Sequence, residues 1–258
     1  MNALELGIGG QTILACEENA LAMRFVGVDL GWKMRPPSKD RTAICILDQS
    51  GLVEDVFSVT SDAEIVAALE EPRSSWIGLD APLIVPNESG MRRCERALFD
   101  RGVRVLPCSR SFLTRKFGGC RGEVVSGMLR EIGFAFPRRQ TREDGVLFEV
   151  YPHGFLRSVL PSPFPRYKKG PCEVRRREAL RLLPLLRRYE PSLAIPDRLE
   201  REIISSPPSL MPAVADKVDS LICVLCLYTH WLYGGKRTEL VGDNEAGFIL
   251  MPRREVIE

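Results

Sequence analysis

The chain has 258 residues, 45% of them hydrophobic, and its 36 Lys and Arg residues nearly balance 34 Asp and Glu residues. This length and apolar content suffice for a buried core, in one large domain or two small ones. A formal net charge of +2 implies no partner by itself. The longest apolar stretch, residues 221–233, is too short to span a bilayer, so composition argues against a membrane protein.

Eight cysteines are scattered along the chain, several of them inside apolar runs. This distribution is typical of free, buried thiols in a reducing cytosol rather than of a disulfide framework. Cys223 and Cys226 have the spacing of a metal or redox pair, but no second pair follows at zinc-site distance. We interpret these two as core residues of a helix and expect a soluble, cytoplasmic protein.

Residues 1–22 show no clear hydrophobic period and precede Met23, after which the first strand is predicted. We expect Met23 to be the natural start and residues 1–22 to be a non-native or disordered leader. Residues 23–258 are then expected to form a single domain.

The segment after Met23 predicts three strands, a helix and a fourth strand. Strand-like runs occupy residues 24–29, 42–47, 52–59 and 75–80. The turn signal at 48–51 favours a hairpin, and Ser61 with Glu64 forms a capping-box pattern that opens a helix. Three antiparallel strands, a helical crossover and a fourth strand beside the first form a recognisable α/β arrangement.

Residues 86–145 are expected to form an insertion of helix and loop, with thirteen Lys and Arg residues against seven Asp and Glu residues. A second basic segment leads into a predicted helix at 173–188. Clustered cations suit a phosphate backbone, although a solvated helix face explains them as well. The candidate nucleic-acid contacts are Arg92, Arg93, Arg96, Lys168, Lys169, Arg175 and Arg176.

Beyond the insertion, a fifth strand is predicted at 146–151 and a long helix at 213–233. A Pro- and Ser-rich linker at 205–212 precedes that helix, and a short strand at 247–251 closes the domain.

Four aspartates are predicted to converge. Asp29 and Asp80 end two strands, and the carboxyl ends of strands are where open α/β sheets place their chemistry. Asp216 and Asp219 are three residues apart, on one side of the long helix near its start. The remainder of that helix is apolar and must pack on the sheet, which brings its acidic end beside both strands.

Crowded carboxylates repel one another and take up protons unless a hard divalent cation binds them, so the cluster predicts Mg²⁺ or Mn²⁺. Two such ions can support an in-line phosphoryl displacement. Alternatively, Asp216 is only a helix-terminal charge and Asp80 only a turn residue. Glu149, inside the fifth strand, is costly unless paired, so it is either a fifth member of the site or the partner of an arginine.

Several of these motifs together resemble one family. They are the segments 27–32 (GVDLGW), 78–82 (GLDAP), 93–96 (RCER), 149–152 (EVYP), 216–219 (DKVD) and 247–252 (GFILMP). They look like the DUF429 family, described as predicted nucleases of the ribonuclease H-like fold. The resemblance runs from about residue 24 to residue 252, and it implies a mixed five-stranded sheet flanked by helices.

The carboxylate layout is also similar to that of RuvC-type resolvases, which carry an acid at the end of the first strand, another at the end of the fourth and an acidic pair on the last helix. This similarity implies that Asp29 bridges the metal ions and that Asp80, Asp216 and Asp219 complete the shell. The shorter acid at Asp80, where resolvases carry glutamate, and the long insertion are departures from that pattern.

The preferred interpretation is a Mg²⁺- or Mn²⁺-dependent nuclease in which Asp29, Asp80, Asp216 and Asp219 are catalytic and Glu149 is auxiliary. A catalytically silent scaffold that binds nucleic acid or protein is the alternative. Asp29-Leu30-Gly31 is similar to the first phosphate loop of sugar kinases and actin-like ATPases, but the duplicated domain of that class has no counterpart in the sequence. DNA or RNA is the expected partner, and a homodimer is left open.

Overall fold

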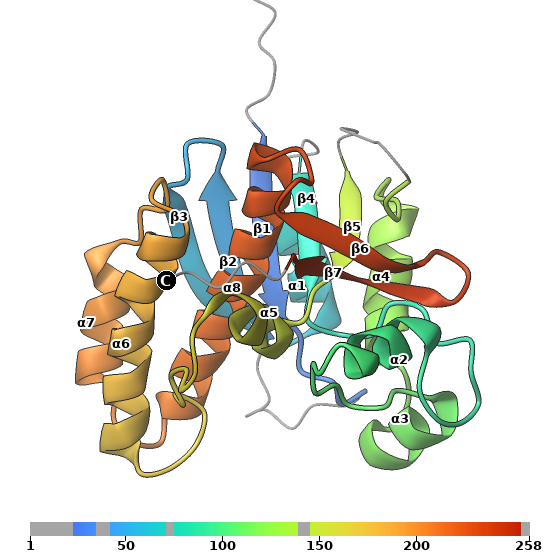
Figure 1. Ribbon diagram of the computed structural model, residues 1–258, viewed down its shortest axis with the longest axis horizontal. Coiled ribbons are helices and arrows are strands. Elements are labelled where there is room, and N and C mark those ends of the chain that lie inside the picture. Colours follow the sequence, from blue (N-terminus) through green and yellow to red (C-terminus); the bar gives the residue numbers. More distant parts are fainter. Residues whose placement is uncertain (1–22, 35–41, 71–74, 139–144, 254–258) are drawn as a thin grey trace, which may run out of the picture.

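The computed structural model describes residues 23–34, 42–70, 75–138 and 145–253, and the expected leader at 1–22 lies outside the described residues. A five-stranded mixed sheet forms the centre of the fold (Figure 1). Its strands are β1 (Arg24–Asp29), β2 (Thr42–Asp48), β3 (Val53–Val59), β4 (Ser75–Leu79) and β5 (Val146–Glu149). They lie in the order β3-β2-β1-β4-β5.

The pairing pattern confirms the predicted topology. Strands β1, β2 and β3 pair antiparallel, whereas β4 lies parallel to β1 and β5 parallel to β4. Helix α1 (Asp62–Leu69) connects β3 to β4 and starts with the predicted capping box between Ser61 and Glu64. The protein is therefore an α/β protein of ribonuclease H-like architecture.

Helices cover both faces of the sheet. The described helices after α1 are α2 (Arg93–Asp100), α3 (Arg110–Phe117), α4 (Arg121–Glu131), α5 (Pro152–Val159), α6 (Cys172–Tyr189), α7 (Asp197–Ser205) and α8 (Met211–Leu232). On one face α8 packs across β1, β2 and β4, with α5, α6 and α7 beside it. On the other face α1 and α4 bury apolar residues against the same strands.

A glycine in β1 lets α8 approach the sheet closely. A Cβ atom built on Gly27 would overlap the carbonyl oxygen of Ser220 and the backbone nitrogen of Val224, both in α8. A Cβ on Gly78 in β4 would lie 2.9 Å from Val150 Cγ2. No larger residue fits at Gly27 without moving the helix, so this glycine fixes the distance between α8 and the end of β1.

Three parts of the fold differ from the sequence prediction, one of them helix α7 (Asp197–Ser205), which was not predicted. The predicted closing strand, β7 (Gly247–Pro252), pairs with an unpredicted strand, β6 (Thr238–Asp243), in a separate two-stranded sheet. Helix α5 was also not predicted, although Pro152 at its first position is a common helix start. The expected insertion contains α2, α3 and α4: α2 and α3 lie beyond one end of the sheet, whereas α4 packs on the same face as α1 (Figure 1).

Candidate metal centre

Two neighbouring strand ends position the first two aspartates. Asp29 is the last residue of β1, and Asp80 follows β4 directly. The parallel register pairs Val28 with Leu79, and the backbone N–H of Asp80 donates to the Val28 carbonyl oxygen at 2.8 Å. Both carboxylates therefore lie at the same end of the sheet, where β1 and β4 have their carboxyl ends.

Helix α8 places a third aspartate, Asp219, beside these strand ends. Asp219 is 4% exposed, and carboxylate oxygens of Asp29, Asp80 and Asp219 all lie within 4.8 Å of one another. Asp216, one turn earlier, lies beside this group and interacts with both Asp29 and Lys168. The structure thus brings together three of the four predicted aspartates as one potential metal-binding group, with the fourth beside it.

Lys168, in the turn between α5 and α6, points its ammonium group into the aspartates. Its Nζ lies 3.5 Å from Asp29 Oδ2 and 3.7 Å from Asp216 Oδ1, and it forms a close ion pair with Asp219. The preceding residue, Tyr167, is buried and donates its hydroxyl to Asp219 Oδ1. From the sequence, Lys168 is predicted to contact nucleic acid, and Tyr167 has no predicted role. No local pattern links this turn to aspartates that are distant in sequence.

The electrostatics of the cluster follow from burial and mutual repulsion. Burial raises the pKa of Asp80 to about 8, and the negative charge of Asp219 adds to the shift. The pKa of Asp29 is raised well above its ordinary value, chiefly by burial, although Lys168 opposes the change. Burial also raises the pKa of Asp216. Although burial disfavours its charge, Asp219 and Asp29 raise the pKa of Lys168, so the ammonium stays protonated.

The donor set fits a hard divalent cation. Asp29, Asp80 and Asp219 offer only carboxylate oxygens, which are the ligands that Mg²⁺ and Mn²⁺ prefer. They come from three separate elements of the fold, two strand ends and a helix, which restrains their positions. A cation in this group would also relieve the repulsion that raises the carboxylate pKa values.

Glu149 is held by an arginine instead. Arg92 Nη1 donates to Glu149 Oε2 at 2.8 Å and Nη2 donates to Oε1 at 2.5 Å, with exposures of 3% and 4% for the two residues. The Leu83 backbone N–H also donates to Oε2, at 3.0 Å. Glu149 adds to the raised pKa of Asp80, so it lies near the cluster. Both carboxylate oxygens of Glu149 already accept hydrogen bonds, which favours a structural ion pair with Arg92 over a role as auxiliary metal ligand.

The predicted nucleic-acid contacts fall into two groups. Arg92 is buried between Glu95 and Glu149, and Arg176 donates to the carbonyl oxygens of Ile203 and Ser206, which ties α6 to α7. The guanidinium groups of Arg92 and Arg176 therefore stabilise the fold through contacts within the protein. The exposed side chains in the set are Arg93, Arg96, Lys168 and Lys169, and Arg175 is half-buried.

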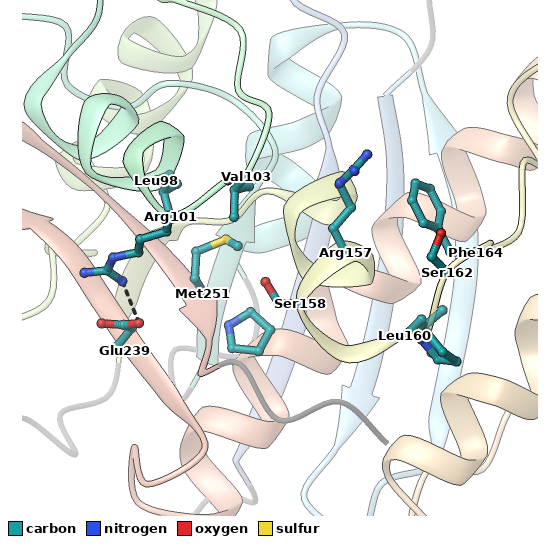
Figure 2. Close-up of a pocket in the computed structure, with 13 residues that line it drawn as sticks. Leu98, Arg101, Val103, Arg157, Ser158, Leu160, Ser162, Phe164, Glu239 and Met251 are labelled. Carbon is teal, nitrogen blue, oxygen red and sulfur yellow. Dashed lines mark hydrogen bonds and ion pairs between the residues drawn. The ribbon is translucent and has the colours of Figure 1, made fainter. Parts of the chain in front are cut away.

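A pocket of about 700 Å³ is lined by none of the four aspartates (Figure 2). It is bounded by α2, α5 and the β6–β7 sheet. Figure 2 shows Arg101 paired with Glu239 on one side, and Arg157 near Phe164 on the other. A smaller pocket includes Asp80 and Trp32, whose Nε1 donates to the Asp80 carbonyl oxygen at 2.8 Å. The indole ring of Trp32 therefore lies beside the candidate metal centre.

The fold and the site define an α/β protein with a carboxylate cluster at the end of a ribonuclease H-like sheet. A family model described as a protein of unknown function (DUF429) matches residues 27–246. The chain belongs to the DUF429 family. Searches of curated proteins and of solved structures returned no match. Among the described residues, no helix combines the length and apolar character needed to cross a bilayer.

Proposed function

We propose that the protein is a divalent-metal-dependent nuclease that hydrolyses phosphodiester bonds with Mg²⁺ or Mn²⁺. One observation carries the proposal: carboxylate oxygens of Asp29, Asp80 and Asp219 lie within 4.8 Å of one another at the end of the sheet. Three buried or half-buried acids at one point are unfavourable without a cation, and Asp29 and Asp80 remain partly exposed there.

Asp29, Asp80 and Asp219 would hold the metal, and Asp216 would adjust the local charge. A bound divalent ion would activate a water molecule and stabilise the charge that develops on the phosphate. Tyr167 fixes the orientation of Asp219 through its hydroxyl hydrogen bond. The Arg92–Glu149 pair holds the loop after Asp80 through the Leu83 N–H.

Nucleic acid is the proposed substrate because cations and an aromatic ring flank the aspartates. Lys169 is exposed in the turn beside the site, and Trp32 is held against the Asp80 backbone. Ammonium groups attract a phosphate backbone, and aromatic rings stack on unpaired bases. We also propose a cytoplasmic location, a single domain spanning residues 23–258 and self-association of the protein.

The test is a cleavage assay on single-stranded, duplex, hybrid and branched nucleic acids with Mn²⁺. The wild-type protein is expected to cleave at least one substrate, and Asp29→Asn to lower cleavage to the level seen with EDTA. Asp100→Asn, at the exposed end of α2, is the matched control and should cleave like the wild type. No metal-dependent cleavage by the wild type on any substrate would refute the nuclease proposal and leave the fold standing.

A catalytically silent nucleic-acid-binding scaffold is the second candidate. It is favoured by the Lys168 ammonium, which already neutralises part of the cluster without a metal. The same assay separates the two candidates when binding is measured in parallel. Tight binding of a nucleic acid, with no cleavage and no dependence on Asp29, would support the scaffold.

A further inference from the structure

The turn that carries Lys168 is anchored rather than loose. The Lys169 backbone N–H donates to the Arg166 carbonyl oxygen, and Gly170 has a positive φ of 99° just before α6 begins. Tyr167 is buried and bonded to Asp219, so the neighbouring residue is held at a fixed place beside the cluster. Although the Lys168 side chain is 42% exposed, its ammonium group is held by carboxylates rather than free in solvent.

The aspartates define two positions for positive charge. Asp29, Asp80 and Asp219 bring their oxygens together at one position. The ammonium of Lys168 lies at the other, where its ion pairs join Asp29, Asp216 and Asp219. Its effect on Asp80 is exerted only through space. Asp29 and Asp219 are common to both positions, whereas Asp80 belongs to the first and Asp216 to the second.

We propose that Lys168 permanently fills the second position, so that the site binds one divalent ion and uses the lysine ammonium as its second positive charge. This inference rests on the metal centre of the proposed function. A second divalent ion would have to displace the ammonium from three carboxylates or share them with it, and repulsion between the two cations opposes sharing. Lys168 is thus a positioning residue that sets the metal stoichiometry.

The charge balance agrees with one ion. Four carboxylates carry four negative charges, and one divalent ion with the ammonium supplies three positive charges. One negative charge remains in the cluster, where Asp219 also accepts a hydrogen bond from the Tyr167 hydroxyl. Two divalent ions together with the ammonium would leave an excess positive charge before any substrate arrives.

The experiment counts Mn²⁺ bound per full-length chain by isothermal titration calorimetry and by electron paramagnetic resonance of the free ion. The wild type is expected to bind one ion, and Lys168→Gln and Lys168→Ala two. Lys169→Gln is the matched control and should bind one, because its side chain is exposed beside the turn. A wild-type count of two or of zero would overturn the inference, and so would a count of one in a folded Lys168→Gln protein.

A second pair of variants, Asp80→Asn and Asp216→Asn, tests the number of metal positions if the Lys168 variants do not fold. Asp80→Asn removes a ligand of the first position and is expected to abolish Mn²⁺ binding. Asp216→Asn removes an acid of the second position only and is expected to leave the count at one. A wild-type count of two that falls to one in Asp216→Asn would show two metal positions and refute the role of Lys168.

Metal counting is independent of catalysis, so the two proposals can fail separately. One bound ion without cleavage of any nucleic acid would refute the nuclease and leave the role of Lys168 intact. Metal-dependent cleavage with two bound ions would do the reverse.

Discussion

Asp29→Asn is expected to stabilise the metal-free protein, although Asp29 is central to the proposed site. The Asp29 carboxylate is buried beside the carboxylates of Asp80 and Asp219, and only Lys168 opposes their repulsion. Asparagine has nearly the same shape and carries no charge. Removing the charge therefore removes repulsion without creating a cavity.

The magnitude follows from the distances. At an effective dielectric constant of about 20, a unit charge within 4.8 Å of Asp29 repels it by at least about 3.5 kcal/mol, and Asp80 and Asp219 each supply such a charge. The attraction of Lys168 at 3.5 Å is about 4.7 kcal/mol on the same scale. The net repulsion is therefore at least about 2 kcal/mol. For a chain of this length, that corresponds to a rise in Tm of about 4–8 °C.

The assay is urea unfolding in EDTA, followed by tryptophan fluorescence, at pH 8 and at pH 5. A carboxyl group whose folded pKa is raised binds more protons in the folded state than in the unfolded state, so its presence lowers stability as pH rises. The gain from Asp29→Asn is thus expected at pH 8 and should shrink towards pH 5. Asp100→Asn, which changes an exposed aspartate at the end of α2, should shift stability by less than about 0.5 kcal/mol.

Two results would refute this reasoning. Loss of stability in Asp29→Asn at pH 8 would mean that the carboxylate makes a net favourable contact in the metal-free protein. An equal gain at both pH values would mean that the effect does not arise from its charge.

Three further predictions follow from the same structure. Gly27→Ala should destabilise the protein by about 1–3 kcal/mol in urea unfolding because its Cβ would overlap the backbone of α8. Gly127→Ala, in open space on α4, is the control and should not destabilise it. Equal effects of the two substitutions would contradict the close packing of α8 on β1. Arg92→Met should cost about 3–5 kcal/mol in the same assay because it leaves Glu149 buried without a partner; Arg93→Met, on the exposed face of α2, should be near neutral, and a stable Arg92→Met protein would argue against the ion pair. Mn²⁺ affinity measured by calorimetry should rise up to about tenfold per pH unit between pH 6 and 8, because Asp80, with its pKa raised to about 8, must lose a proton to bind metal; an affinity independent of pH would count against Asp80 as a ligand.

The sheet and the aspartates could be predicted because their signals are local. Apolar runs that end in Asp29 and Asp80 indicate buried strands, and the Ser61–Glu64 capping box marks the crossover helix. The apolar α8 had to pack on the sheet, which placed Asp219 beside both strand ends. Amphipathic and apolar patterns therefore carried most of the site.

The remaining features depend on contacts that no local pattern reveals. Lys168 lies 139 residues from Asp29 in sequence. Its segment is basic, so the sequence predicts a contact with nucleic acid rather than with aspartates. Similarly, Glu149 in a strand indicated a buried partner but did not say which arginine provides it, and the structure identifies Arg92. The short strand β6 was missed because its six residues, TELVGD, include only two apolar residues and these are adjacent, so no alternating pattern marks a strand.

The central claim is that Asp29, Asp80 and Asp219 together bind a divalent cation. Anomalous diffraction from crystals grown with Mn²⁺ tests this most directly. One anomalous peak is expected about 2–2.5 Å from a carboxylate oxygen of each of the three aspartates, with the Lys168 ammonium still beside Asp216. Absence of a peak there at millimolar Mn²⁺, with the lysine ammonium in its place, would contradict it.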